Sequence, residues 1–368
     1  MSYKLFTSES VAAGHPDKIA DAVSDAILDE ILRQDPMGRA GLETIVGADT
    51  IGLFGEIKTN AKIDFDNVAR EAIAKLGYTN PEWNFSNKST IINNIHQQSP
   101  EISMGVDQEG AGDQGMMFGF ACDETPELMP LPITLAHALT RRLDEVRETG
   151  VLDYIRPDGK SQVTVRYEND KPVAVEKVVL AVAHTEETDH KELQTGLIKE
   201  VINPVLEKYG YTVTENQITI NGTGLWHIPG PDTDAGLTGR KIVVDGYGGY
   251  ARVGGGAFSG KDPSKVDRSG AYAARYIAKN VVAKGLATKC EVALAYVIGQ
   301  AQPLMKAFDT FGTETSSLDE IQKFIDGLLD TSVKGIIDGL DLRRPIYSST
   351  TAYGHFGKAE LPWEQIAK

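Results

Sequence analysis

The residues best suited to chemistry lie in a glycine-rich stretch that covers residues 246–268. Six glycines fall between positions 246 and 256, and Lys261, Lys265 and Arg268 follow them. Glycine lacks a Cβ, so its backbone N–H groups can approach a polyanion closely, while the cationic side chains supply positive charge beside them. This combination suits a chain of linked phosphates.

A helix is predicted directly after the glycines. Asp262 and Pro263 form a good helix start, with an N-cap acceptor and proline in the first turn, and Gly285 is a plausible end. The N-terminus of such a helix favours an anion. Residues 255–261 also match a P-loop except that Asp262 replaces its Ser or Thr. A mobile surface loop is the alternative, although alternating charges are unusual for a linker.

The overall charge narrows the class of ligand. The chain has 368 residues, enough for two or three domains, and 37 Lys and Arg against 52 Asp and Glu give a net charge of −15. Such a field repels nucleic acid and anionic membranes, so we expect neither as a partner. A phosphorylated ligand must then be held by a local basic cluster.

The two cysteines and the N-terminus predict a location. Cys122 and Cys290 lack metal-ligand spacing and are too few for a disulfide framework. Residues 1–6 do not form a signal peptide, and no apolar run approaches the roughly 20 residues that span a bilayer. We expect a soluble cytoplasmic protein with buried thiols.

A second chemical motif precedes a predicted helix over residues 16–33. Pro16 suits the first helical turn, which places His15 and Asp17 at the positive end of the helix dipole. His15 could contact a phosphate, and Asp17 could hold a hard cation such as Mg²⁺. The two residues are explained equally well without a ligand: His15 would cap the helix, and Asp17 would compensate the helix dipole.

The order strand, strand, helix, strand occurs twice and predicts an α+β protein with a weak threefold repeat. Strands within 43–57, a helix over 64–76 and a strand over 89–95 form the first copy. The second copy has strands at 163–168 and 173–183, a helix at 189–208 and a strand at 217–220. A third, less regular copy has a helix around 269–283, a strand at 292–298 and helices around 318–329 and 331–339.

Other candidate residues lie in strands and loops. Glu43 and Glu56 could meet a cation and an amine, although strand glutamates are usually just solvated. Residues 98–115 could close over a site or serve as a linker, and Trp226 could stack on a base or lie in a core. No Ser–His–Asp or Cys–His pattern suggests a covalent nucleophile. A polyphosphate site with Mg²⁺ and cationic clamps fits these residues best.

The chain resembles the S-adenosylmethionine synthetases (methionine adenosyltransferases). The motifs that carry the resemblance run through nearly the whole chain: Gly14–Lys18, Gly110–Gly115, Gly236–Lys241, Gly254–Asp262, Arg344–Tyr347 and Ala352–Gly357. The resemblance implies domains at 1–100, 109–226 and 227–368, and a mobile active-site loop at 98–109. It implies a homodimer or homotetramer with active sites between subunits.

The family reaction supplies the expected roles. Methionine sulfur attacks C5′ of ATP, and the expelled tripolyphosphate is hydrolysed to phosphate and diphosphate, with two Mg²⁺ per site and K⁺ as cofactors. The resemblance implies catalytic roles for His15, Lys160, Arg240, Lys241, Lys261 and Lys265. It implies that His15, Asp113, Asp158, Lys160, Trp226, Asp234, Arg240, Lys241, Ala257 and Lys261 bind ATP. Methionine would meet Glu56, Gln98, Asp234 and Lys265, while Asp17 and Asp267 would hold Mg²⁺ and Glu43 would serve K⁺.

Departures from the family pattern leave two alternatives. Phe120 replaces a usual Tyr, Leu225–Trp226 replaces a basic residue followed by Phe, and residues 107–109 form a shorter stretch than in many members. A nucleotide-binding regulatory subunit would bind ATP analogues without turnover. A phosphotransferase or ATPase that uses residues 255–261 would leave ADP, and Asp262 argues against it.

Overall fold

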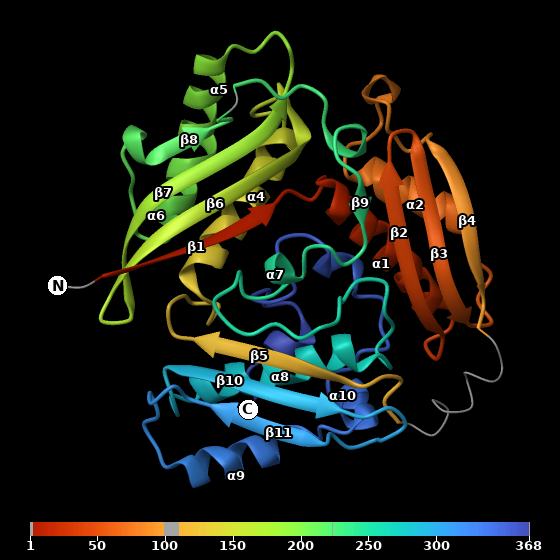
Figure 1. Cartoon of the computed structure of the whole chain (residues 1–368), viewed down its shortest axis with the longest axis vertical. Helices are drawn as coiled ribbons and strands as arrows, with labels where there is room; N and C mark the ends of the chain where they lie inside the picture. The colour runs from red at the N-terminus through yellow and green to blue at the C-terminus, as the bar shows by residue number, and fades with distance from the viewer. Residues whose placement is uncertain (1–2, 99–109, 223, 368) are drawn as a thin grey trace.

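Three β-sheets surround a central set of helices and loops in the computed structural model (Figure 1). The structure describes residues 3–98, 110–222 and 224–367. Residues 99–109 of the predicted active-site loop lie outside these ranges, and only its first residue, Gln98, is described.

The first unit contains α1 (Pro16–Gln34), β2 (Arg39–Gly47), β3 (Thr50–Lys58), α2 (Phe65–Lys75) and β4 (Thr90–Gln97). β2 and β3 form an antiparallel hairpin, and β4 adds to β3 in parallel after the α2 crossover. Alternate residues of β2 are buried against α1, as the period of a half-buried strand requires. Asp64 caps α2, and Gly77 follows its end with φ +95°.

The second unit repeats this order with a longer hairpin and a shorter last strand. It contains α4 (Leu131–Glu148), β6 (Ile155–Glu168), β7 (Lys171–His184), α5 (His190–Leu197), α6 (Asn203–Lys208) and β8 (Ile218–Ile220). The predicted continuous helix 189–208 has a π-helical turn at Ile198–Ile202. Pro204 has no N–H to donate to the Glu200 carbonyl, and Arg142 Nε donates to that carbonyl at 2.9 Å instead. The proline therefore accounts for the irregular turn.

The third unit is less regular, as predicted. It contains α8 (Val266–Ala283), β10 (Lys289–Tyr296), β11 (Met305–Asp309), α9 (Leu318–Leu328) and α10 (Val333–Gly339). β10 and β11 form an antiparallel hairpin, and no parallel third strand joins it within the described residues. α8 packs on the sheet and contacts α9 and α10. The α+β class with three related units is thus confirmed.

Each sheet is extended by a strand from a different part of the chain. β1 (Lys4–Val11) pairs with β6, β5 (Gly115–Cys122) pairs with β10, and β9 (Gly236–Leu237) pairs with β2, all antiparallel. In each case the added strand lies against the first strand of the hairpin. The three units are therefore interleaved, because each borrows one edge from a neighbour.

The predicted helix start at Asp262–Pro263 is wrong, since α8 begins at Val266 after Lys265 at the N-cap. Asp262 instead binds β2, because its N–H donates to the Ala40 carbonyl at 3.1 Å. Its carboxylate accepts the Ala40 N–H at 2.9 Å and the Ser264 N–H at 2.8 Å. Asp262 thus ties the glycine-rich segment to the first sheet. A P-loop needs a helix that begins directly after its lysine, and no helix begins directly after Lys261.

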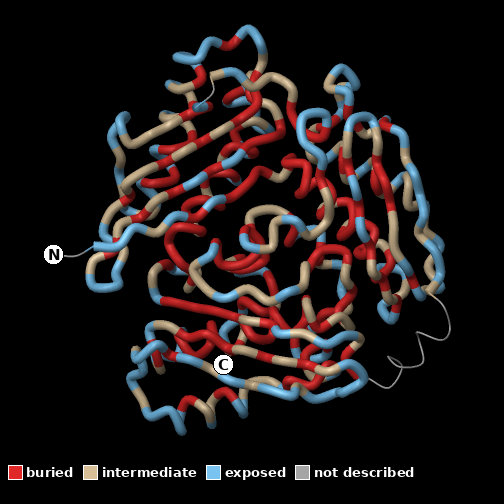
Figure 2. The backbone as a smooth tube through the Cα atoms, viewed as in Figure 1, coloured by how far each residue is buried: buried red, intermediate tan, exposed pale blue. Residues whose placement is uncertain are grey.

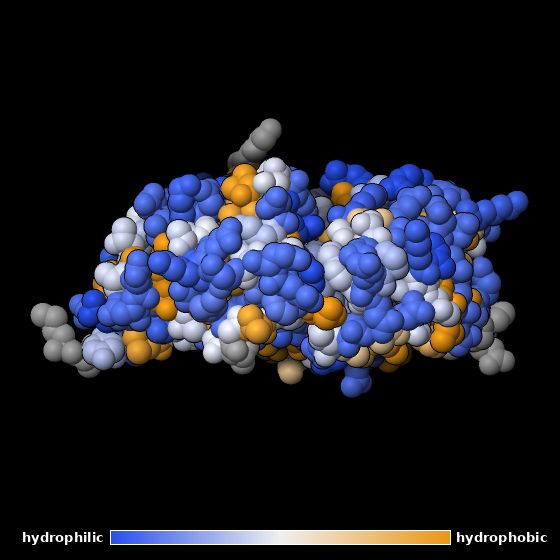
Figure 3. Space-filling model, turned by 90° about the horizontal axis from the view of Figure 1, so that it is seen from above, coloured by the Kyte–Doolittle hydropathy of each residue, from blue (hydrophilic) through white to orange (hydrophobic). Residues whose placement is uncertain are grey.

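Many of the residues in the middle of the molecule, between the three sheets, are buried (Figure 2). One hydrophobic cluster joins the first and third units, and a second lies within the central unit. The face shown in Figure 3 is mostly hydrophilic with scattered hydrophobic residues. Among the described helices, none combines the length and the apolar character needed to cross a membrane. Short helical turns lie at Pro81–Trp83, Glu215–Gln217, Gly230–Asp232, Ile242–Asp245 (α7), Ser348–Thr350 and Pro362–Glu364.

Candidate active site

Asp17, in the first turn of α1, collects cations from a distant segment. Its carboxylate accepts Lys241 Nζ at 2.5 Å and the Leu237 N–H at 3.0 Å, and Arg240 Nε lies 3.6 Å from Oδ1. Pairing of β9 with β2 brings residues 236–241 to the start of α1. We call His15, Asp17, Lys160, Arg240 and Lys241 the Asp17 group.

His15 has a defined tautomer. Its Nδ1 lies 3.2 Å from the backbone N–H of Asp17, so Nδ1 accepts and the ring proton resides on Nε2. Nε2 is buried and has no hydrogen-bond partner among the described residues. Burial and then the Lys241 and Lys160 charges lower the pKa of His15 from 6.5 to about 3. A neutral imidazole with one N–H donor is therefore held at the positive end of α1.

Lys160, on β6, joins the same group because Val11 at the end of β1 pairs opposite it. Lys160 is exposed and acts electrostatically on His15. Two residues earlier, Asp158 is buried and accepts the Gly230 N–H at 2.9 Å. Burial raises the pKa of Asp158 to about 7. β6 thus carries a cation and a buried carboxyl toward the start of α1.

The segment after β8 lies alongside the start of β6. The His184 N–H donates to the Trp226 carbonyl at 2.9 Å, and Arg156 donates to the His227 carbonyl. Trp226 is half-buried, and its indole donates to the Ile228 carbonyl at 2.9 Å. Asp234 is exposed further along this segment and acts electrostatically on Asp158.

A second set of predicted residues lines a cavity of about 480 Å³ at the first sheet. Lys261 Nζ pairs with Asp267 Oδ2 at 2.6 Å, and Lys265 Nζ pairs with Asp262 Oδ2 at 2.5 Å. The predicted residues that line this cavity are Glu43, Glu56, Gln98, Asp113, Lys261, Lys265 and Asp267. We call these seven residues the Asp267 group.

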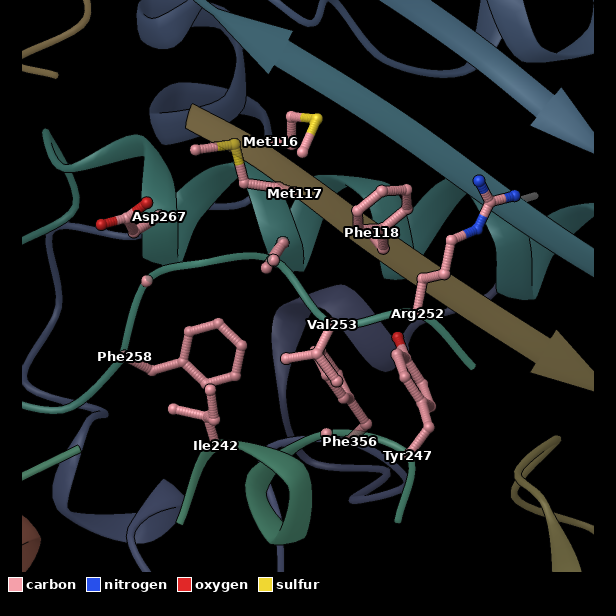
Figure 4. A pocket seen from close by; sticks show the side chains of 14 residues that line it. Met116, Met117, Phe118, Ile242, Tyr247, Arg252, Val253, Phe258, Asp267 and Phe356 are labelled. Atoms are coloured by element: carbon pink, nitrogen blue, oxygen red, sulfur yellow. The ribbon is translucent and has the colours of Figure 1, made fainter. Parts of the chain in front are cut away.

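Two glycines of the loop are required by close contacts. Gly260 has φ +80°, and a Cβ there would lie 2.0 Å from the Leu42 carbonyl oxygen. A Cβ on Gly256 would lie 2.0 Å from Cγ of Asp267. A smaller cavity beneath this loop is lined by Met117, Phe258 and other side chains (Figure 4). Its volume of about 20 Å³ has room for little more than one water, so it cannot hold a nucleotide.

The Asp17 group and the Asp267 group make separate sets of contacts. Asp17 begins α1, whereas Asp25 contacts the loop that carries Lys261, and eight residues of helix span roughly 12 Å. Ala257 lies next to the turn that carries Arg240, because a Cβ on Gly239 would approach the Ala257 Cβ to 2.4 Å. Lys160 and Arg240 are therefore gathered near His15, whereas Lys261 pairs with Asp267 in the second group.

Comparison with known proteins identifies the family. The sequence profiles of the S-adenosylmethionine synthetase N-terminal, central and C-terminal domains match residues 3–100, 108–226 and 228–365. The S-adenosylmethionine synthase of Desulforudis audaxviator (strain MP104C) is 50% identical over 385 aligned residues, which cover 100% of this chain and 97% of that protein. The chain belongs to the S-adenosylmethionine synthetase family. The resemblance inferred from the sequence is thus confirmed, and the protein is an enzyme of the methionine adenosyltransferase class.

Sequence reasoning missed Arg39 and Phe54, which also line the cavity of this S-adenosylmethionine synthetase. Arg39, Gly41 and Glu43 alternate along β2 and share one side of the strand. The same period of two from the predicted Glu43 would have identified Arg39. Phe54 lies opposite Glu43 in the hairpin, and its ring gives the cavity an apolar surface.

Proposed function

We propose that this S-adenosylmethionine synthetase uses the two groups to join methionine to the adenosyl part of ATP. The methionine sulfur forms a bond to C5′ while the C5′–oxygen bond breaks, and tripolyphosphate leaves with the electron pair. Water then cleaves tripolyphosphate to phosphate and diphosphate. The observation that carries the proposal is the buried Nε2–H of His15, which has no hydrogen-bond partner in the described part of the chain and lies beside Asp17, Lys241 and Lys160.

The residues present suit this chemistry. A thioether is a soft nucleophile that needs no general base, so the protein must mainly align it and stabilise the leaving anion. His15 Nε2–H would donate to an oxygen of the departing chain, and Lys160, Arg240, Lys241 and Lys261 would balance its charge. Phe54 and Glu56 in the cavity offer an apolar surface and an anion, which suit a methionine side chain and its ammonium group.

Mg²⁺ fits Asp17 and Asp267 only together with the substrate. Among the described residues, no three His, Cys, Asp or Glu side chains gather as a ready-made metal site. Mg²⁺ commonly binds proteins through one or two carboxylates plus substrate phosphates. Asp17 and Asp267 would each supply such a carboxylate, and bound Mg²⁺ would spread the charge of the phosphates. The exposed Glu43 would serve K⁺, in keeping with the family resemblance.

We propose that two copies of the chain complete each active site. The Asp17 group of one copy would face the Asp267 group of the other, and two-fold symmetry would give two sites per dimer. The side of β2 that carries Glu43 also exposes Ile45, and β4 exposes Ile92, which are 46% and 53% exposed. Such apolar residues on a sheet face suit contact with a second copy. The buried free thiols of Cys122 and Cys290 suit the reducing cytoplasm.

A product assay tests the reaction. Incubation with ATP, methionine, Mg²⁺ and K⁺ should give S-adenosylmethionine, phosphate and diphosphate in equal amounts, which can be separated by liquid chromatography. Omitting methionine should abolish the sulfonium product, and replacing K⁺ with Na⁺ should slow its formation. Abundant ADP without a sulfonium product would contradict the proposal. Binding of ATP analogues without turnover would instead favour a regulatory subunit.

Mixed dimers test where the site lies. A His15→Asn chain and a Lys261→Met chain, carrying different affinity tags, should each be nearly inactive alone. If each site takes His15 from one copy and Lys261 from the other, the purified heterodimer keeps one intact site. We therefore expect about half of wild-type turnover per dimer. A heterodimer as inactive as its parents would place both residues in one chain's site.

A further inference from the structure

Four aspartates follow one another at intervals of four residues along α1: Asp17, Asp21, Asp25 and Asp29. This spacing places them on one side of the helix. All four are buried, and each accepts backbone N–H groups from a segment far away in the sequence. Asp17 already belongs to the site, so the question is what the next two carboxylates do.

Asp21 holds the turn that carries Arg240 and Lys241. Its Oδ1 accepts the Gly239 N–H at 2.9 Å, one residue before Arg240. Its Oδ2 accepts Lys18 Nζ at 3.0 Å, and Lys18 is itself almost fully buried. Because a buried carboxylate with a cationic partner makes a strong, short-range bond to an N–H, the position of this turn is closely defined.

Asp25 holds the loop that carries Lys261. Its Oδ1 accepts the Gly260 N–H at 2.8 Å, one residue before Lys261. Arg268 binds both oxygens of Asp25, at 2.7 and 2.8 Å, and also donates to the Lys261 carbonyl at 3.2 Å. Asp25 and Arg268 thus fix the backbone on both sides of the Lys261 nitrogen.

Both carboxylates belong to one buried network. Lys18 also pairs with Asp245, whose Oδ1 lies 3.9 Å from His355 Nε2. His355 Nδ1 lies 2.7 Å from the Tyr272 hydroxyl, which accepts Arg268 Nε at 3.0 Å. The turn at Gly239 and the loop at Gly260 are therefore held in a fixed relation by side chains that never reach the cavity.

We propose that Asp21 and Asp25 are positioning residues for the reaction: they aim Lys241 and Lys261 at the polyphosphate by fixing the glycine that precedes each cationic segment. The inference rests on the proposed function. It adds two residues that touch neither substrate nor metal and act only through the backbone of Gly239 and Gly260. A displacement of about 1 Å at such clamps can cost about 10²-fold in rate.

Asp29 provides a matched control on the same helix. It is 5% exposed, and its two oxygens accept the Tyr347 and Ser348 N–H groups at 2.9 and 2.8 Å. It therefore makes the same kind of bond from the same side of α1. The segment that it holds carries none of the predicted site residues and meets the site only indirectly, through Arg268 over the Tyr347 ring. Loss of Asp29 should therefore affect folding far more than turnover.

The experiment compares Asp21→Ala, Asp25→Ala and Asp29→Ala in the full-length enzyme, well below each melting temperature. For the first two we expect kcat to fall about 10²-fold, with a much smaller change in the KM for methionine. Asp29→Ala should lower the melting temperature and reduce kcat far less than the other two variants. Calorimetric titration with Mg²⁺ and inorganic tripolyphosphate should show weaker binding only for Asp21→Ala and Asp25→Ala.

Milder variants cover the case in which an alanine protein does not fold. The Asn variants keep an oxygen that can accept the glycine N–H, so Asp21→Asn and Asp25→Asn should retain more turnover than the Ala variants. Equal kcat and equal tripolyphosphate affinity in all variants would overturn the proposal, as would an equal loss in Asp29→Ala. If wild-type protein bound tripolyphosphate but made no S-adenosylmethionine, the proposed function would fail while the binding comparison still tested Asp21 and Asp25.

Discussion

Replacement of Lys261 by methionine should lower kcat by about 10²–10³-fold, the range typical for removal of one group that stabilises a developing anion. Methionine keeps most of the volume of the side chain and removes its charge. In the free protein that charge pairs with Asp267, and we expect it to matter most as tripolyphosphate departs. The KM for methionine should change much less, because the lost interaction strengthens in the transition state.

Steady-state kinetics with each substrate varied in turn would measure this split. Lys306→Met is a matched control, because Lys306 Nζ pairs with Asp326 at 2.5 Å and its side chain is 22% exposed, against 28% for Lys261. Lys306 lies on β11, away from both groups, so its variant should keep wild-type kcat. Unchanged kcat in Lys261→Met with weaker methionine binding would assign Lys261 to methionine instead.

Local patterns predicted most of the first two units. Patterns in nearby residues predict β2 and β3 with their turn, α2, β4 and the β6–β7 hairpin, although β2 and β6 begin earlier than predicted, at Arg39 and Ile155. Sequence reasoning missed α4, although Leu135, Leu139 and Leu143 recur every four residues there. Pro130 and Pro132 at its start suggest a loop, yet prolines suit a first helical turn.

The exchanged strands could not be predicted from local patterns. β1 pairs with β6 about 150 residues away, and β9 has only two residues and pairs with β2. β5 completes the third sheet from the middle of the chain. Their pairing depends on which edge each unit leaves open after it folds, and no property of these short segments records that edge.

The candidate site shows the same division. The residue types near glycine indicated phosphate chemistry, and the structure places those residues in two groups, but which residues belong to each group depends on the tertiary fold. The four-residue spacing of Asp17, Asp21, Asp25 and Asp29 was visible in the sequence. Aspartates at this spacing resemble the solvated face of an amphipathic helix. Only the distant segments that contact these four aspartates show that they are buried.

The position of the glycines links these observations. Gly239 and Gly260 both have positive φ, and each precedes a cationic residue of the site. Each also presents its N–H to an aspartate of α1. Helix α1 thus orders two cationic segments that would serve different active sites in the proposed dimer. A change in the position of α1 would therefore move cationic residues in both active sites.

His15→Asn should lower kcat by about 10²–10⁴-fold, the usual range for a positioned proton or hydrogen-bond donor. The pKa of about 3 keeps His15 neutral throughout the range from pH 5 to 8, so its Nε2–H is present at every working pH. We therefore expect no step in wild-type kcat/KM, which reports groups of the free enzyme, near pH 6.5 from this residue. Such a step, absent in His15→Asn, would contradict the neutral tautomer.

The same residue should leave a signature in stability. The folded pKa of His15 lies below the unfolded value of 6.5, so between pH 6.5 and about 3 the unfolded chain binds more protons at this site. Stability therefore falls as the pH falls through that window, by about 1.4 kcal/mol per pH unit for one such histidine. His15→Asn removes this contribution, so its free energy of unfolding should depend less steeply on pH around pH 5.

His137 provides a control that separates the effect of His15 on turnover from its effect on the pH dependence of stability. It is buried, its Nδ1 lies 2.8 Å from the Ser10 hydroxyl, and burial holds its pKa well below the usual value. His137→Asn should flatten the pH dependence of urea unfolding as His15→Asn does. Each variant loses one histidine that is neutral in the folded protein at pH 5 and protonated in the unfolded chain at the same pH. Only His15→Asn should lose turnover, since its ring alone presents a donor beside Asp17 and the cations. Equal kcat for the two variants would show that His15 has no specific role in the reaction.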